Sequence, residues 1–125
     1  MRLLLASALL LASAAAVSAQ PAPAAPPPSF DVPAAPTTVY IARRDMKPGE
    51  SIGLHTHAGV EMTEVITGDF DLIADGKTTH YHAGDTFIVP RGVKHDGKNV
   101  GTTPAILAVT WVLDKGAPLR SPASP

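Results

Sequence analysis

Three histidines and one glutamate stand within two glycine-punctuated stretches of short predicted strands, and this arrangement constrains the chain more than any other feature. Alternate residues of a strand project to the same face, so His55 and His57 direct both imidazoles to one side. Glu61 follows a glycine-containing bend and returns toward the same interior. His95 lies in the second stretch and approaches from a different strand, as a ligand set that surrounds an ion requires. The spacing therefore predicts a metal site between strands, with these four side chains as ligands.

The segment from residue 37 to 118 is predicted to consist of strands and turns, because its apolar residues do not recur with the period of a helix. Its clearest turn is Asp75-Gly76, a two-residue hairpin signal between strands over 70–74 and 77–82. Roughly eight or nine short strands at this spacing predict an all-β fold, an antiparallel sandwich or barrel in one domain. The other strands are expected over 37–43, 51–57, 62–67, 86–89, 94–99 and 105–113.

The chain before this domain begins with an apolar segment. Residues 1–19 place one arginine before an apolar run and end in Val17-Ser18-Ala19, a pattern typical of a secretory signal peptide. A membrane anchor is the rival interpretation, but leucine is confined to the first half of the run, which favours removal over anchoring. We therefore expect an exported protein, periplasmic or secreted, without a stable membrane anchor.

Two further segments flank the domain. Residues 20–36 are rich in proline and alanine, and prolines at this density remove too many backbone donors for a core to form. We predict an extended linker of polyproline II character here. Residues 119–125 are predicted to be a flexible tail, which leaves 37–118 as the folded domain.

The charge pattern narrows the class of partner. The formal net charge is −1 at pH 7, and the only adjacent basic residues are Arg43 and Arg44, so nucleic acid is not an expected partner. The chain has no cysteine, and the domain must be stable without disulfides. A small-molecule ligand or substrate is the expected partner, and an edge strand or the N-terminal segment offers a surface for homodimerisation.

The two stretches resemble the two sequence motifs of the cupin superfamily, whose members are small β-barrels of the jelly-roll type. The resemblance is strongest to the small, single-domain, exported members of the quercetin-dioxygenase-like type. It implies an antiparallel jelly-roll β-barrel, and it carries the metal ligands of the family over to His55, His57, Glu61 and His95. Every motif position is matched, by Gly49, His55, His57, Glu61 and Gly68 in the first motif and by Gly84, Pro90, Gly92, His95 and Asn99 in the second.

The resemblance fixes the fold more closely than the reaction. It implies a divalent transition metal as cofactor, and the ligand types suit iron, manganese, nickel, copper, zinc or cobalt, so the identity of the ion stays open. The leading hypothesis is a metal-dependent dioxygenase or related enzyme acting on a small organic molecule. The second is a non-catalytic module that uses the metal to hold an oxyanion or a sugar. A third is a structural jelly roll with a vestigial site, and no residue is assigned as a catalytic acid or base.

Other polar residues near the motifs have simpler interpretations. Glu64 is an additional carboxylate, but strand parity with an inward Glu61 directs it outward unless a bulge intervenes. Asp96 is likewise predicted to point away from the metal. His80 and His82 form a second His-x-His pair that lacks a nearby carboxylate, which favours an exposed pair over a ligand set.

Structural roles are expected for the remaining candidates. Trp111 is predicted to fill the core, with the pocket mouth as a second choice, and Asn99 is predicted to stabilise a turn. The apolar wall of the pocket is expected to come from alternating strand positions. Candidate lining residues are Val60, Val65, Phe87, Val89, Leu107 and Val109.

Overall fold

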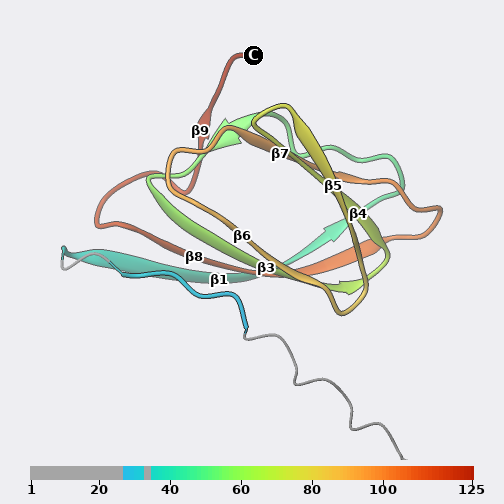
Figure 1. Cartoon of the computed structure of the whole chain (residues 1–125), viewed down its shortest axis with the longest axis horizontal. Coiled ribbons are helices and arrows are strands. Elements are labelled where there is room, and N and C mark those ends of the chain that lie inside the picture. Colours follow the sequence, from blue (N-terminus) through green and yellow to red (C-terminus); the bar gives the residue numbers. More distant parts are fainter. Residues whose placement is uncertain (1–26, 33–34) are drawn as a thin grey trace, which may run out of the picture.

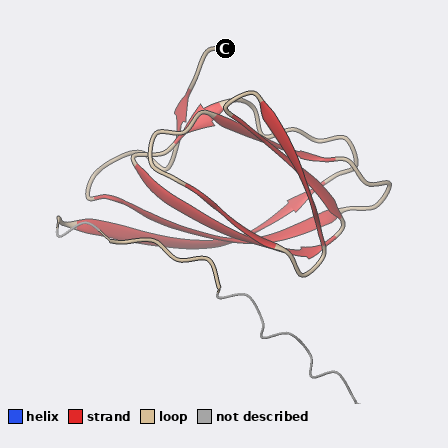
Figure 2. Ribbon diagram, in the orientation of Figure 1, coloured by secondary structure: helices blue, strands red, loops and turns tan. Residues whose placement is uncertain are grey.

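The computed structural model describes residues 27–32 and 35–125, and within these ranges the chain forms strands and turns without a helix (Figures 1 and 2). All strand pairs are antiparallel. The strands are β1 (Thr37–Met46), β2 (His55–Thr56), β3 (Gly59–Thr67), β4 (Asp69–Ala74), β5 (Lys77–His82), β6 (Thr86–Val89), β7 (His95–Asn99), β8 (Ala105–Asp114) and β9 (Ser121–Pro122).

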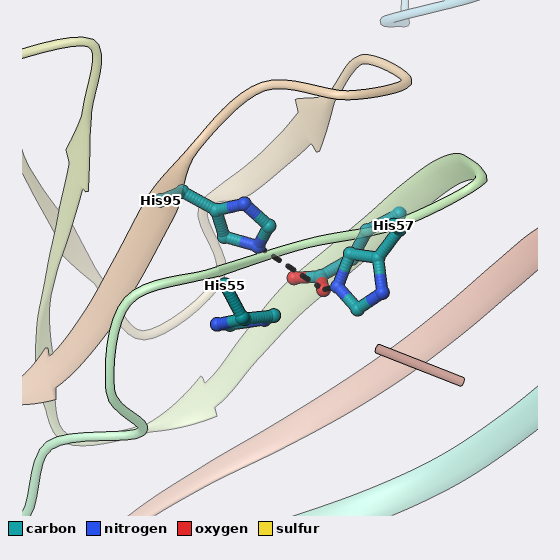
Figure 3. Close-up of side chains that lie close together, drawn as sticks. His55, His57 and His95 are labelled. Atoms are coloured by element: carbon teal, nitrogen blue, oxygen red, sulfur yellow. Dashed lines mark ion pairs between the residues drawn. The ribbon is translucent and has the colours of Figure 1, made fainter. Parts of the chain in front are cut away.

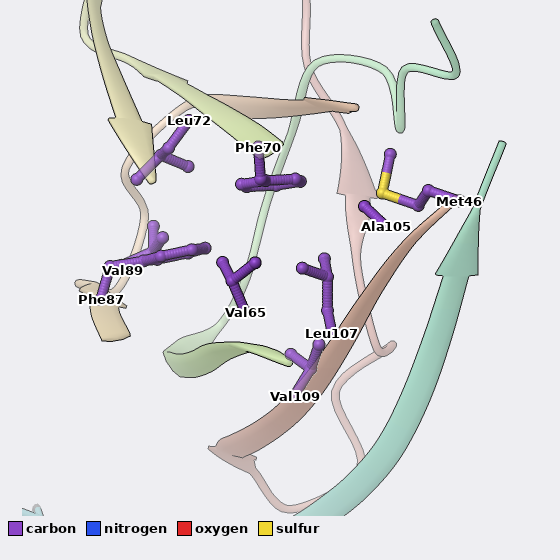
Figure 4. Packing of buried hydrophobic residues seen from close by; sticks show 9 residues of the cluster. All are labelled: Met46, Val65, Phe70, Leu72, Phe87, Val89, Ala105, Leu107 and Val109. Carbon is purple, nitrogen blue, oxygen red and sulfur yellow. The ribbon is translucent and has the colours of Figure 1, made fainter. Parts of the chain in front are cut away.

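The strands form two sheets, one of order β1-β8-β3-β6 and one of order β5-β4-β7-β2-β9. Apolar side chains from both sheets make a common core (Figure 4). Phe70 on β4 stacks on Phe87 on β6 with the ring centroids 5.7 Å apart, so the two sheets are packed face to face. The buried cluster consists of Met46, Val65, Phe70, Leu72, Phe87, Val89, Ala105, Leu107 and Val109.

This architecture confirms the predicted all-β, antiparallel jelly-roll fold in a single domain. The predicted hairpin joins β4 to β5, and both turn residues have positive φ, 48° at Asp75 and 75° at Gly76. Such angles are what a tight two-residue turn between twisted strands requires. The sequence pattern therefore located this hairpin correctly.

Three strands differ clearly from their predicted bounds. The strand expected over 37–43 continues to Met46, because β1 stays paired with β8 as far as Ala105. The strand expected over 51–57 is regular only in β2, because the chain turns at Gly53, where φ is 90°. The strand expected from residue 62 begins earlier, at Gly59, directly against β8. A Cβ atom at Gly59 would lie 2.0 Å from the carbonyl oxygen of Val112, so only glycine allows β3 to begin so close to β8.

The predictions for the segments that flank the domain can be compared with the structure only in part. The predicted signal peptide, residues 1–19, lies outside the described residues, and the described linker residues 27–32 form neither strand nor helix. Residues 119–125, predicted to be a flexible tail, instead contribute β9, which pairs with β2. Pro122 is tolerated because β9 is at the edge of its sheet, where a missing donor costs little. Within the described ranges, no helix has the length and apolar character needed to cross a bilayer.

Candidate metal centre

Three histidines converge from strands β2 and β7 and the residue that follows β2. His55 lies opposite His95 in the β2–β7 register, and their ring centroids are 4.2 Å apart. The ring of His57 lies 4.8 Å from that of His55 and 5.2 Å from that of His95. All three side chains are buried. Figure 3 shows the three imidazoles grouped around a common point. His95 lies 40 residues after His55 and 38 after His57 in the sequence, and the pairing of β7 with β2 brings it to them.

Glu61 completes the group from β3, a strand of the facing sheet. Its Oε2 atom lies 2.9 Å from Nε2 of His57 and 3.7 Å from Nε2 of His95 (Figure 3). The hydroxyl of Thr63 donates to Oε1 at 3.0 Å, and the indole N–H of Trp111 donates to Oε2 at 2.8 Å. The carboxylate is thus held by its own sheet while it faces the imidazoles of the other.

Each of the three imidazoles places Nδ1 against a backbone carbonyl oxygen, at 2.5 to 2.9 Å. A carbonyl accepts but cannot donate, so in the neutral ring Nδ1 carries the proton and Nε2 keeps its lone pair. This is the tautomer that a metal-binding Nε2 needs. The carbonyl partners are Gly53 for His55, Leu119 for His57 and Val93 for His95.

The four side chains also alter one another's protonation. Burial alone would raise the pKa of Glu61, but the rings of His57 and His95 and the indole of Trp111 together hold that pKa well below its usual range. Burial lowers the pKa of His55. Burial also acts to lower the pKa of His95, but the Glu61 carboxylate and the carbonyl of Val93 together outweigh it, and the net shift is upward. The centre therefore presents an ionised carboxylate to three imidazoles.

An observation independent of the ligand spacing also indicates that these residues fit a divalent metal ion. The Nε2 atoms of His57 and His95 are buried and have no hydrogen-bond partner within the described ranges, although both face the Glu61 carboxylate. Leaving such an atom unpaired costs about 1–3 kcal/mol, a cost that a bound cation would remove. Each of the four residues offers one ligand atom, and these atoms all lie within 4.8 Å of one another. Three imidazole nitrogens and one carboxylate oxygen suit several transition metals, so the ligand set does not identify the ion.

Comparison with known proteins agrees with this geometry. A model of the cupin domain matches residues 42–113, a range that holds all four side chains. The chain belongs to the cupin family. The expectation drawn from the two glycine-punctuated motifs is thereby confirmed.

Two of the matches to this cupin are from Thermotoga maritima. An oxalate-binding protein is 35% identical over 64 residues, which cover 50% of the cupin and 53% of the relative. The crystal structure of a predicted oxalate decarboxylase is similar with a TM-score of 0.56 and 31% identity, over 58% of the cupin and 64% of that chain. The cupin thus spans about half the length of the curated relative that it matches.

A third similar structure extends over more of the chain. It is an uncharacterised conserved protein with a double-stranded β-helix domain from Klebsiella pneumoniae subsp. pneumoniae. The TM-score is 0.60 and the identity 29%, over 70% of the cupin and 76% of that chain. The shared architecture is therefore found in a protein of no stated activity as well as in the oxalate-related ones.

A small cavity of about 100 Å³ opens beside the metal-ligand residues of the cupin. Its wall is largely apolar, from Ile52, Phe70, Leu107, Val109 and Leu119. Two arginines also line it. The Nε atom of Arg44 is buried without a hydrogen-bond partner within the described ranges, and Nη1 of Arg120 donates to the carbonyl of Ile52 at 3.3 Å. The cavity thus joins the metal ligands to two guanidinium groups.

The predicted lining residues divide into three groups. Leu107 and Val109 line the cavity as expected. Val65, Phe87 and Val89 are instead packed in the core. Val60 is half-buried between the buried Gly59 and Glu61, so by parity it projects to the other face of β3, and its assignment to the wall was wrong.

Other polar residues take the structural roles that parity indicated. Glu64 is exposed on β3. The four candidate ligands His55, His57, Glu61 and His95 are called the cage below. Asp96 faces away from the cage and accepts hydrogen bonds from the Ser51 hydroxyl at 2.7 Å and the Gly53 N–H at 2.8 Å. These two bonds hold the loop before His55. Asn99 is fully buried and donates to two backbone carbonyls at 3.0 and 2.8 Å.

Two features near the site were missed. Trp111 packs against the core cluster and lines the cavity, in agreement with the two places expected for it, but its hydrogen bond to Glu61 was not predicted. That bond forms because Trp111 lies opposite Glu61 in the β3–β8 register. His80 and His82 are exposed as predicted, but the expectation that no carboxylate lies near them is wrong. Asp69 and Asp71 contact them from the neighbouring strand, at positions that the two-residue turn of the hairpin determines.

Proposed function

We propose that the cupin domain binds a divalent transition metal through His55, His57, Glu61 and His95 and uses it to bind a small carboxylate oxyanion such as oxalate. The observation that carries this proposal is the position of two arginines beside the cage. Of the charged residues lining the cavity in the described part of the chain, those outside the cage are both cationic. When bound, a divalent ion of this kind acts as a Lewis acid toward an oxyanion.

Arg44 supports recognition of a carboxylate by direct chemistry. Its planar guanidinium presents several N–H donors in a fork that matches two carboxylate oxygens. Its Nη2 atom lies 3.5 Å from Glu50, a long contact, while Nε is buried and unpaired. A carboxylate in the cavity would satisfy that donor. Phe70, Leu107 and Val109 reduce competition from water and so strengthen the ionic contact.

The size of the cavity favours a ligand of few atoms. A volume of about 100 Å³ suits a small dicarboxylate better than a molecule of flavonol size. The matches to an oxalate-binding protein and to the structure of a predicted oxalate decarboxylase, both from Thermotoga maritima, support the same ligand class.

A second proposal is a metal-dependent reaction, such as a dioxygenation or decarboxylation, on the same small molecule. The enclosure of the cavity supports it, because apolar walls protect a reacting group from water. Binding without turnover is the better supported of the two. The charged groups that line the cavity outside the cage are arginines, and an arginine stays protonated and cannot act as a general base.

The test is calorimetric titration of oxalate into the full chain, first loaded with Mn²⁺ or Zn²⁺ and then stripped of metal. We expect saturable binding only in the loaded protein, and a loss of tenfold or more in affinity for Arg44→Met. The matched control is Arg43→Met, since Arg43 is exposed and paired with Asp45. Equal affinity in loaded and stripped protein, or in the two variants, would contradict the proposal. Oxygen uptake and release of carbon dioxide, measured in the same samples, decide whether a reaction follows binding.

A further inference from the structure

A second group of metal-ligand side chains lies on the outer face of the β4–β5 hairpin. His80 and His82 project outward from β5, while Tyr81 between them packs inward against Phe87 with ring centroids 4.7 Å apart. On the neighbouring strand, Asp69 and Asp71 alternate with the buried Phe70 and project to the same outer face. The cage described above lies on the inner side of the same sheet, so the two groups are separate.

The register of the hairpin pairs each aspartate with one histidine. Asp69 stands opposite His82, and Asp71 stands opposite His80. The Nδ1 atom of His82 lies 2.8 Å from Oδ1 of Asp69, and the Nδ1 atom of His80 lies 2.6 Å from Oδ1 of Asp71. The two rings meet edge to face with centroids 4.5 Å apart. Four side chains from two strands are therefore already in mutual contact.

The arrangement leaves ligand atoms in reach of a single ion. Because Asp71 accepts the Nδ1 proton of His80, the Nε2 atom of that ring keeps its lone pair. This Nε2 lies 3.9 Å from Oδ1 of Asp69. Asp69, His80 and His82 each offer one ligand atom, and these atoms lie within 4.8 Å of one another. Small shifts of exposed side chains would bring all three to coordination distance of one ion.

We propose that Asp69, His80 and His82 form a second metal site, for a divalent transition metal such as Zn²⁺, with Asp71 as a positioning residue. Two imidazoles and a carboxylate are suitable ligands for such an ion. Asp71 acts as the carboxylate that orients a metal-bound histidine through its other ring nitrogen. The site does not depend on the function proposed for the buried cage.

The site would join an edge strand to its sheet. β5 is the outermost strand of the five-stranded sheet and pairs with β4 alone. An ion held by Asp69 on one strand and by His80 and His82 on the other cross-links them and stabilises the folded state by mass action. The imidazole side chains are 43% and 67% exposed, so this ion exchanges with solvent and binds more weakly than one in the buried cage.

The experiment is Zn²⁺ titration of the full chain by calorimetry, in a His57→Ala background that disables the buried cage. We expect one Zn²⁺ per chain to remain, and to be lost when His80→Ala is added. Adding Asp71→Asn should keep the stoichiometry and weaken the affinity about tenfold. Thr78→Ala is the matched control, since Thr78 is an exposed residue of the same strand and face.

A folded His57→Ala protein that binds no Zn²⁺, or that binds it equally with His80→Ala and with Thr78→Ala, overturns the proposal. A second measurement covers the case in which His57→Ala does not fold. Cu²⁺ added to the wild-type chain should broaden the amide NMR signals of β4 and β5 as well as those around the cage. Broadening confined to the cage would also overturn it. In His80→Ala, we expect Cu²⁺ to leave the β4 and β5 signals sharp while it still broadens the signals around the cage. This result would show that the second site is independent of the cage and of the function proposed for it.

Discussion

At the scale of single residues, the cage is defined as much by what holds its ligands as by the ligands. Nδ1 of all three histidines faces a backbone carbonyl, and both oxygens of Glu61 accept hydrogen bonds from its own sheet. Ligands fixed in this way lose little freedom when an ion binds. Side chains that touch no metal should therefore affect metal affinity.

Trp111 gives the most direct test of that inference. Trp111→Phe keeps the aromatic ring but removes the N–H that donates to Glu61 at 2.8 Å. We expect Zn²⁺ affinity to fall about tenfold, because the carboxylate loses one of the groups that orient it. Competition against a chelator of known affinity measures the change. Val112→Ala on the same strand serves as control, and equal affinities for Trp111→Phe and the wild type would show that the indole has no positioning role.

The protonation of His95 sets the pH at which metal binding begins to weaken. A metal competes with the proton for the imidazole, so affinity falls as pH drops through the pKa of a ligand histidine. The pKa of His95 is raised, so the decline begins at a higher pH than for an ordinary histidine, while that of His55 is lowered and this ring stays neutral longer. Glu61 stays ionised between pH 7.5 and 5.5 because its pKa is lowered.

We therefore expect the dissociation constant for Co²⁺ to rise at least about tenfold between pH 7.5 and 5.5. Trp111 is the only tryptophan of the chain and lies 6.1 Å from the ring of His57, so quenching of its fluorescence reports binding. Constant affinity across this range would be incompatible with histidine ligation.

At the scale of elements, the start of β3 is decided by one close contact. Gly59→Ala would place a methyl group against the backbone of β8, at 2.0 Å from the carbonyl oxygen of Val112, and push β3 away. We expect a loss of about 3 kcal/mol in the free energy of unfolding, measured by urea denaturation. Gly76→Ala is the comparison, because a Cβ atom at residue 76 would meet no atom within 4 Å and would add only the strain of a positive φ. Equal losses in the two variants would show that the close approach to β8 carries no energetic weight.

The elements also show how far the sequence could predict this protein. Strand periodicity and the turn at Asp75-Gly76 suffice for the hairpin, and its register follows from that turn. The contacts of Asp69 with His82 and of Asp71 with His80 could therefore have been predicted. Trp111 and Glu61 could not be paired in this way, since β3 and β8 are distant in sequence and their register shifts between Val65 and Thr67.

The four candidate ligands could be named from their spacing, because strand parity and the family motif both select them. The sequence gives no local signal for what orients His57, whose carbonyl partner Leu119 is 62 residues away. The other two partners are local, since Gly53 and Val93 each lie two residues before the histidine that they orient. The orientation of a ligand histidine can thus be predicted where its carbonyl partner is a near neighbour in sequence. It cannot be predicted where the partner lies in a distant segment.

At the scale of the whole molecule, the C-terminal segment closes the metal centre. β9 pairs with β2, the N–H of Ala123 donates to the carbonyl of Leu54 at 3.1 Å, and Leu119 supplies the acceptor for His57. Arg120 of the same segment lines the cavity. The segment thus reaches the site through its backbone and also through the side chains of Leu119 and Arg120.

Removal of residues 119–125 should therefore weaken metal binding more than it weakens the fold. We expect a 10- to 100-fold loss in Zn²⁺ affinity, the range found when an outer-shell partner of a ligand histidine is removed. The core cluster contains none of these residues, so the urea midpoint of the metal-free protein should change little. Leu119→Ala is the matched control, because it keeps the carbonyl that accepts from His57 and should retain most of the affinity. If the truncated chain binds Zn²⁺ as tightly as the full chain, the carbonyl of Leu119 does not orient His57 for the metal.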